Sequence, residues 1–159
     1  MNAVCYSNSE EATYILGREI GKLLFQGAFL ALWGGLGAGK TAFARGVGAA
    51  FDIHDITSPT FTIMQVHEGK LPLYHFDVYR LSSGDELYDI GFDERELSGG
   101  VTLMEWPENV IQALSDDRLD ILIEGNGDKV RRIFFDTDNP KFEPVIRLAK
   151  SQKEDEKTC

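Results

Sequence analysis

Residues 34–41 of the chain read Gly34-Gly35-Leu36-Gly37-Ala38-Gly39-Lys40-Thr41. The stretch matches the pattern G-x-x-x-x-G-K-[ST], in which a loop of small residues turns successive backbone N–H groups toward a phosphate. The apolar run 28–33 before it is typical of a strand buried on both faces, and residues 41–51 after it look helical. The alternative, a glycine-rich turn that contains a lysine by chance, would not require a buried strand before it and a helix after it. We therefore interpret residues 34–41 as a phosphate-binding loop (P-loop) between a buried strand and a helix.

The chain around this loop predicts a small P-loop NTPase-like α/β fold of three layers, with a central and mostly parallel sheet. A capping-box pattern at residues 7–11 starts a helix that we expect to end at Gly27. The β-rich runs 60–66 and 71–79 predict a hairpin, which adds an antiparallel extension to the sheet. We also expect short strands at 101–104, 120–124 and 131–135, and helices within 85–97 and 107–114. Pro140 and Pro144 are expected to break up the end of the chain.

The chain has 159 residues with 16 basic and 26 acidic side chains, a net charge of −10, and its length and 43% hydrophobic content predict one domain. We place that domain at 1–149, followed by a polar tail at 150–159. Residues 85–120 carry eleven acidic and two basic residues, hence −9 of the charge. This balance disfavours direct contact with tRNA or another nucleic acid. We expect the acidic segment to face a protein partner.

Neither export nor a membrane location is expected from the sequence. Cys5 and Cys159 lie at opposite ends of the chain and form no metal-ligand spacing. No targeting segment starts the chain, and the longest apolar run is too short to cross a bilayer. We therefore expect a cytoplasmic protein.

The loop itself suggests roles for its last two residues and requires an acid nearby. Lys40 would reach the β- and γ-phosphates of a nucleotide, and the hydroxyl of Thr41 would bind Mg²⁺. Asp77 and Glu105 each end a predicted strand, so both would face the crevice at the carboxyl edge of the sheet. We prefer Glu105 as the metal ligand and Asp77 in a supporting metal or water-positioning role. Taken alone, each residue is equally well explained as a solvated acid at a strand end.

Weaker candidates surround this set. Thr60 lies where nucleotide switches place a γ-phosphate-sensing threonine, although Ser-Pro-Thr is also ordinary turn chemistry. His75 is more often a hydrogen-bonded structural residue than a ligand or base. Trp106 could stack on a base, bind a partner or pack in the core. Arg131 and Arg132 could contact a phosphate or ribose, or simply be solvated.

Two absent features narrow the class of nucleotide site. The sequence lacks an [NT]-K-x-D motif, so nothing supports recognition of guanine. It also lacks the arginine-rich lid segment with which small-molecule kinases close over two phosphates, and the acidic segment 85–120 stands about where such cations would be needed.

Four segments together resemble the TsaE/YjeE family: GGLGAGKT (34–41), TSPTFT (57–62), YHFDVYRL (74–81) and MEWP (104–107). The resemblance covers about residues 5–136. It implies the ATPase component of the bacterial machinery that makes threonylcarbamoyladenosine on tRNA. Such a protein binds ATP and Mg²⁺, hydrolyses ATP slowly and acts on the partner proteins TsaD and TsaB.

The resemblance also implies a set of site residues. Thr41 and Glu105 would hold Mg²⁺, Thr60 would be the switch threonine, and Asp77 and Trp106 would be needed for turnover. The nucleotide would be bound by Gly34, Gly35, Leu36, Gly37, Ala38, Gly39, Lys40, Thr41, Ala42, Ser9, Glu10, Arg131 and Arg132.

One position departs from the family pattern, which commonly has aspartate where this chain has Gly35. An acid there would sit close to the γ-phosphate or the attacking water, so its loss affects hydrolysis more than nucleotide binding. Two other functions therefore stay open beside the ATPase. One is a P-loop small-molecule kinase, and the other is a non-catalytic, nucleotide-dependent binding module.

Overall fold

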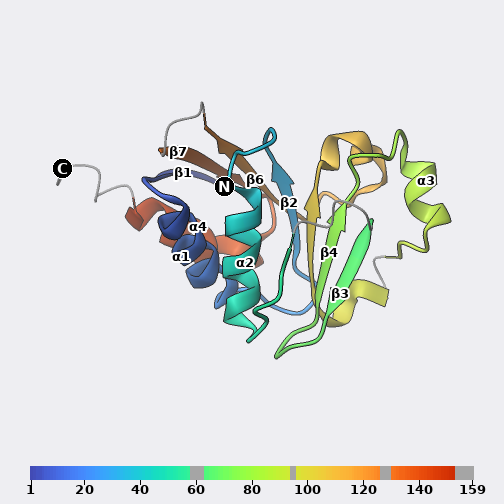
Figure 1. Cartoon of the computed structure of the whole chain (residues 1–159), viewed down its shortest axis with the longest axis horizontal. Helices are drawn as coiled ribbons and strands as arrows, with labels where there is room; N and C mark the ends of the chain where they lie inside the picture. Colours follow the sequence, from blue (N-terminus) through green and yellow to red (C-terminus); the bar gives the residue numbers. More distant parts are fainter. Residues whose placement is uncertain (58–62, 94–95, 126–129, 153–159) are drawn as a thin grey trace.

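A seven-stranded sheet forms the centre of the protein, seen in a computed structural model that describes residues 1–57, 63–93, 96–125 and 130–152 (Figure 1). The strands are β1 (Asn2–Ser7), β2 (Phe29–Trp33), β3 (Met64–His67), β4 (Leu73–Asp77), β5 (Val101–Glu105), β6 (Leu119–Glu124) and β7 (Arg131–Asp136). The α-helices are α1 (Glu10–Gly21), α2 (Lys40–Ala50), α3 (Gly84–Asp89) and α4 (Glu143–Ser151). Short 3-10 turns are η1 (Glu96–Gly99), η2 (Pro107–Asn109), η3 (Ile111–Ala113) and η4 (Pro140–Phe142).

The strand order β1-β7-β6-β2-β5-β4-β3 places β2 in the middle of the sheet. Strands β6, β2, β5 and β4 run parallel to one another, whereas β1, β7 and β3 pair antiparallel to their neighbours. The predicted α/β class and mostly parallel sheet with an antiparallel extension are confirmed. Because β2 has parallel neighbours on both sides, its carboxyl end lies at the point where ligands bind in open α/β sheets.

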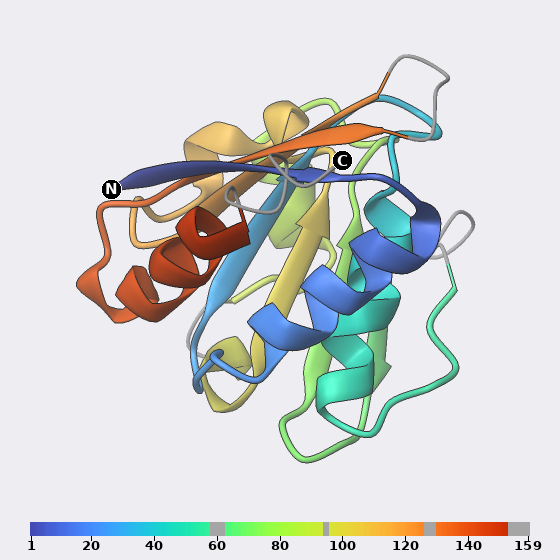
Figure 2. The same cartoon turned by 90° about the vertical axis from the view of Figure 1, so that its left-hand side faces the viewer.

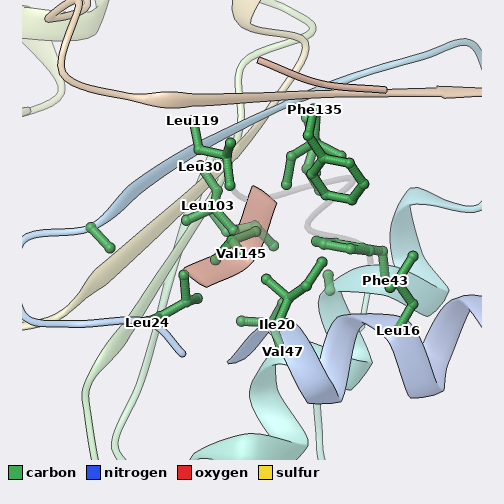
Figure 3. Close-up of a cluster of buried hydrophobic side chains, with 14 of the residues drawn as sticks. Leu16, Ile20, Leu24, Leu30, Phe43, Val47, Leu103, Leu119, Phe135 and Val145 are labelled. Atoms are coloured by element: carbon green, nitrogen blue, oxygen red, sulfur yellow. The ribbon is translucent and has the colours of Figure 1, made fainter. Parts of the chain in front are cut away.

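Two apolar layers cover the sheet from opposite sides. Helices α1, α2 and α4 pack on one face (Figure 2) and contribute Ile20, Phe43 and Val145 to a core shared with Leu30 and Leu103 (Figure 3). A second, smaller cluster lies on the other face under α3, η2 and η3, and contains Phe76, Leu87, Met104, Val110 and Leu114. This arrangement gives the three layers expected from the sequence.

Helices α1 and α2 approach each other so closely that only glycine fits between them. A Cβ atom on Gly46 would lie 2.0 Å from the carbonyl oxygen of Tyr14, and one on Gly17 would lie 2.3 Å from that of Phe43. Both obstacles are backbone atoms, so no side-chain movement could relieve the overlap. This contact fixes the start of α2, and with it the loop before α2, against α1.

Several sequence-based boundaries are wrong. The first helix ends at Gly21 and not at Gly27, because residues 22–28 turn back toward the sheet and Gly27 adopts a left-handed conformation (φ 86°) before β2. The segment 107–114 forms two 3-10 turns rather than one helix. The sequence did not predict strand β1, because its last residue overlaps the helix-start pattern at residues 7–11.

The prolines near the end of the chain start helical turns instead of breaking them. Pro140 and Pro144 occupy the first turns of η4 and α4, where the missing N–H of proline has no helical partner to lose. Helix α4 continues to Ser151, two residues into the segment 150–159 that we expected to be a tail. Among the described residues, no helix has the length and apolar character needed to cross a membrane.

Candidate nucleotide-binding site

The phosphate-binding loop connects the end of β2 to the start of α2, as the sequence predicts. Gly37 (φ 74°) and Gly39 (φ 110°) adopt backbone conformations that other residues rarely take, and Gly39 is the N-cap of α2. By contrast, a Cβ atom on Gly35 would have no neighbour within 4 Å. Gly34 also has a positive φ (142°), and a Cβ atom on it would lie 2.5 Å from the carbonyl oxygen of Ile123. The backbone therefore requires glycine at three loop positions but leaves room for a side chain at Gly35.

Lys40, the first residue of α2, holds a buried ammonium group inside this loop. Its Nζ atom donates a hydrogen bond of 2.7 Å to the carbonyl oxygen of Gly34 and lies 3.8 Å from the centroid of the Trp106 ring. Burial lowers the pKa of Lys40, and the nearby carboxylates of Glu105 and Asp77 oppose that shift. The site thus combines one buried cation with two carboxylates that interact with it electrostatically.

Asp77 and Glu105 are cross-strand partners at the carboxyl ends of β4 and β5. Glu105 also pairs in register with Leu32 of β2, two residues before the loop begins. The pairing of three parallel strands therefore brings both acids to the same end of the sheet as Lys40. The predicted positions of the two acids at strand ends had suggested this location.

The two carboxylates differ in their surroundings. Glu105 is buried, with 3% of its surface exposed, and its Oε2 atom lies 2.8 Å from Nε2 of His75. Asp77 is half-buried and accepts a hydrogen bond of 3.0 Å from the backbone N–H of Tyr79. Burial raises the pKa of Asp77, and the charge of Glu105 adds to this, whereas the Tyr79 bond and Lys40 act in the opposite direction. Both acids are thus held in partly desolvated positions, where charged groups interact strongly with a bound ion.

We expect Asp77→Asn to raise the melting temperature of the nucleotide-free protein at pH 7 by up to about 3 °C, since 1 kcal/mol corresponds to roughly 2–4 °C in a chain of this size. The folded state raises the pKa of this acid, so its ionised form opposes folding above that pKa. The gain should therefore shrink as the pH falls through the raised pKa toward about 4, the ordinary value for aspartate, and be lost below it. Calorimetric melting at pH 7 and at pH 4 measures it. A variant less stable than wild type at pH 7 would contradict the assignment.

Trp106 lies beside the site, at the edge of the second apolar cluster. Its backbone is left-handed (φ 62°, ψ 44°), a strained conformation for a large side chain, and Pro107 follows it. The ring contacts the Lys40 ammonium and lies 4.8 Å from the ring of Tyr79, centroid to centroid. Trp106 is therefore neither simply packed in the core nor free to stack on a base. Strain of this kind is frequent at functional sites.

The two predicted arginines lie on opposite faces of β7, because side chains alternate along a strand. Arg131 lies over Gly125 and its Nη2 atom donates a bond of 3.3 Å to the carbonyl oxygen of Gly37 in the loop. Arg132 is exposed, and its guanidinium carbon lies 4.5 Å from the centroid of the Phe134 ring. The structure thus brings Arg131 to the phosphate-binding loop and leaves Arg132 away from it.

The start of α1 lies next to the loop. Ser9 is the N-cap of α1 and accepts a 3.0 Å bond from the N–H of Ala12, and Thr13 lies beside Gly39. Glu10 is exposed in the first turn of α1. Ala42 is buried in α2, and Leu36 is 86% exposed at the tip of the loop. Thr60 lies outside the residues that the structure describes.

His75, whose sequence position favours a structural role over that of a ligand or base, contacts the candidate metal ligand Glu105 directly. The sequence held part of the signal, because residues i and i+2 of a strand share a face and His75 therefore lies on the same face as Asp77. The pairing register was needed to convert that signal into a contact.

The donor set fits Mg²⁺ bound together with a nucleotide. Within the described parts of the chain, no group of three or more His, Cys, Asp or Glu side chains could hold a metal ion by itself. Mg²⁺, however, is usually bound by one or two carboxylates together with substrate phosphates and water. A threonine hydroxyl at Thr41 and the buried carboxylate of Glu105 are donors of that kind.

Comparison with known proteins shows the family of the chain. The sequence profile of the family described as "Threonylcarbamoyl adenosine biosynthesis protein TsaE" matches residues 7–133. The chain is 42% identical over 127 residues to the tRNA threonylcarbamoyladenosine biosynthesis protein TsaE of Treponema pallidum, covering 77% of this chain and 94% of that protein. The protein of the same name from Bacillus subtilis is 44% identical over 119 residues, 74% of each chain.

The crystal structure of Bacillus subtilis YdiB superimposes with a TM-score of 0.78 at 32% identity and covers 95% of both chains. The fold, the phosphate-binding loop and the sequence similarity therefore agree over most of the chain, which belongs to the TsaE family of threonylcarbamoyl adenosine biosynthesis proteins.

Proposed function

We propose that this protein is a cytoplasmic, Mg²⁺-dependent ATPase that binds ATP and hydrolyses it slowly to ADP and phosphate. Its activity would serve the threonylcarbamoyladenosine modification of tRNA, at the adenosine next to the anticodon, through the partner proteins TsaB and TsaD. One observation carries the proposal. Lys40, Asp77 and Glu105 gather around a P-loop at the carboxyl ends of adjacent parallel strands.

Each residue has a distinct role in this proposal. The loop N–H groups and the Lys40 ammonium hold the phosphates, and the start of α2 contributes its positive dipole end. Thr41 and Glu105 hold Mg²⁺, which neutralises charge on the β- and γ-phosphates when it is bound. Asp77 orients the attacking water, because it is an acid beside the metal ligand that keeps partial exposure. Arg131 steadies the loop through the carbonyl oxygen of Gly37.

The direct test is phosphate release from ATP with and without the TsaB–TsaD pair. We expect slow hydrolysis by the protein alone, faster hydrolysis with both partners, and loss of hydrolysis in Glu105→Ala. If calorimetry detects no ATP binding in the presence of Mg²⁺, the proposal fails at its first step. ATP binding without phosphate release, even with both partners, would instead favour the non-catalytic binding module, which glycine in place of aspartate at position 35 leaves open. Phosphate appearing on an added metabolite would favour the kinase.

The acidic face of α3 is where we expect a protein partner to bind. Asp85 and Asp89 are exposed there together with Tyr88 (58%) and Ile90 (39%), and Figure 1 shows α3 on the opposite side of the sheet from α1 and α2. Exposed aromatic side chains among charges are typical of protein interfaces.

Neutralising this face with Asp85→Asn, Glu86→Gln and Asp89→Asn together should weaken association with TsaB–TsaD by roughly tenfold at low salt, because rim charges steer association. Glutamine at 86 keeps one oxygen that can accept one of the two bonds that Ser82 donates to Glu86. Surface plasmon resonance measures association, and ATP binding should not change. The matched control removes three exposed acids elsewhere, with Glu68→Gln, Asp138→Asn and Glu143→Gln. If the two triple variants bind TsaB–TsaD with equal affinity, the acidic face of α3 is not the partner-binding surface.

A further inference from the structure

His75 is a buried histidine whose imidazole ring has one hydrogen-bond partner among the described residues, the Glu105 carboxylate. It lies in β4 with no exposed surface, and Nε2 is 2.8 Å from Oε2 of Glu105, which is itself 4% exposed at the side chain. The two residues are diagonal neighbours across the parallel pair, since His75 pairs in register with Leu103 and Glu105 with Asp77.

The proposed metal role of Glu105 sets the direction of this bond. A carboxylate that binds a metal ion only accepts hydrogen bonds, so in that role Glu105 is the acceptor and Nε2 of His75 the donor. The bond holds Oε2 on the His75 side and leaves the other carboxylate oxygen, Oε1, for a different partner. A carboxylate that would otherwise rotate about its last side-chain bond is thereby restricted in orientation.

The rest of the imidazole ring argues against a purely structural role. Its Nδ1 atom is buried and has no hydrogen-bond partner within the described residues. Leu73, two residues before His75 on the same face of β4, and the register partner Leu103 are both fully buried and apolar. An apolar side chain of similar volume would fill this position without leaving a buried nitrogen unpaired, which opposes folding. The polar ring at this position is therefore best explained by the contact between Nε2 and the Glu105 carboxylate.

We propose that His75 is a positioning residue that orients the Glu105 carboxylate toward the Mg²⁺ of bound nucleotide. The inference rests on the proposed function, in which Glu105 is a metal ligand. Groups that hold a ligating side chain through a hydrogen bond commonly change metal affinity by 10-fold to 100-fold when they are removed. His75 itself contacts neither metal nor nucleotide in this scheme.

The test is calorimetric binding of a non-hydrolysable ATP analogue, measured across a series of Mg²⁺ concentrations and separately in EDTA. In His75→Leu, the Mg²⁺ concentration for half-maximal enhancement of analogue binding should rise about 10-fold to 100-fold. Affinity in EDTA should stay within about threefold of wild type, because the loop and Lys40 are untouched. His75→Gln should restore the Mg²⁺ dependence to within about threefold, since its amide N–H can donate to Glu105.

Two further variants separate the possible failures. Glu105→Gln should lose most of the Mg²⁺ enhancement, and His67→Leu is the matched control, a histidine-to-leucine change on the neighbouring strand β3 beside Asp55. If Glu105→Gln loses the enhancement but His75→Leu matches wild type, the role of His75 is refuted and the metal role of Glu105 stands. If wild-type protein binds the analogue equally well in Mg²⁺ and in EDTA, both are refuted.

A second comparison keeps the test decisive if circular dichroism shows that His75→Leu does not fold. His75→Asn has a shorter side chain whose amide cannot reach the position of Nε2, whereas the amide of His75→Gln can. The glutamine variant should then need about 10-fold less Mg²⁺ than the asparagine variant. Equal Mg²⁺ dependence in the two would refute the positioning role.

Discussion

Replacing Lys40 with alanine should weaken the binding of Mg²⁺-ATP by at least about 100-fold. Lys40 is 6% exposed as a residue, and its ammonium lies within the loop that would surround the phosphates, where the surrounding protein screens its charge poorly. Truncating one partner of a buried, hydrogen-bonded charge pair removes about 2–5 kcal/mol, and each 1.4 kcal/mol is a factor of ten. Isothermal titration calorimetry with the wild-type and variant proteins gives the two dissociation constants.

The folded state should tolerate this change. Burial lowers the pKa of Lys40, so placing its ammonium inside the protein opposes folding, and its removal should leave the melting temperature within a few degrees of wild type. Lys70→Ala is the matched control, because it removes the same charge from an exposed lysine that pairs with Asp52. A dissociation constant for Lys40→Ala within threefold of wild type would show that the loop does not bind the phosphates.

Gly46→Ala should lower the melting temperature by roughly 6–12 °C, corresponding to about 3 kcal/mol or more in a chain of this size. The new methyl group would lie 2.0 Å from the carbonyl oxygen of Tyr14 and 2.8 Å from the backbone nitrogen of Arg18. Helices α1 and α2 must therefore separate, which opens the main apolar core at Ile20 and Val47 (Figure 3). Differential scanning calorimetry measures the loss.

Gly99→Ala provides the comparison, since a methyl group there meets no atom within 4 Å and the backbone is not left-handed. It should change the melting temperature by only about 1–2 °C, as surface substitutions do. If both alanine variants melt within 2 °C of each other, the close packing of α1 on α2 is wrong. Nucleotide affinity of folded Gly46→Ala should also fall, because α2 begins at the loop.

The parts of the fold that depend on local sequence were predicted well. The apolar run before the loop, the glycines with left-handed backbone and the helix after it follow from the conformational preferences of neighbouring residues. The β3–β4 hairpin was predicted for the same reason. The wrong end of α1 and the missed strand β1 have a common cause. Apolar residues at 23–24 continue the helical spacing although the chain has already turned, and β1 becomes recognisable only through its pairing with β7.

The sequence by itself determined the phosphate-binding loop and the two acids at strand ends. The eight residues of the loop are consecutive, so their backbone conformation and their side-chain chemistry depend on local sequence. Resemblance in four short segments of this kind identified the family. Tertiary structure alone decided that Asp77 and Glu105 are register partners, that His75 contacts Glu105, and that Arg131 reaches the loop while Arg132 does not. These relations depend on strand order and register, which are set by burying the strands against distant parts of the chain, and no single stretch of sequence specifies them.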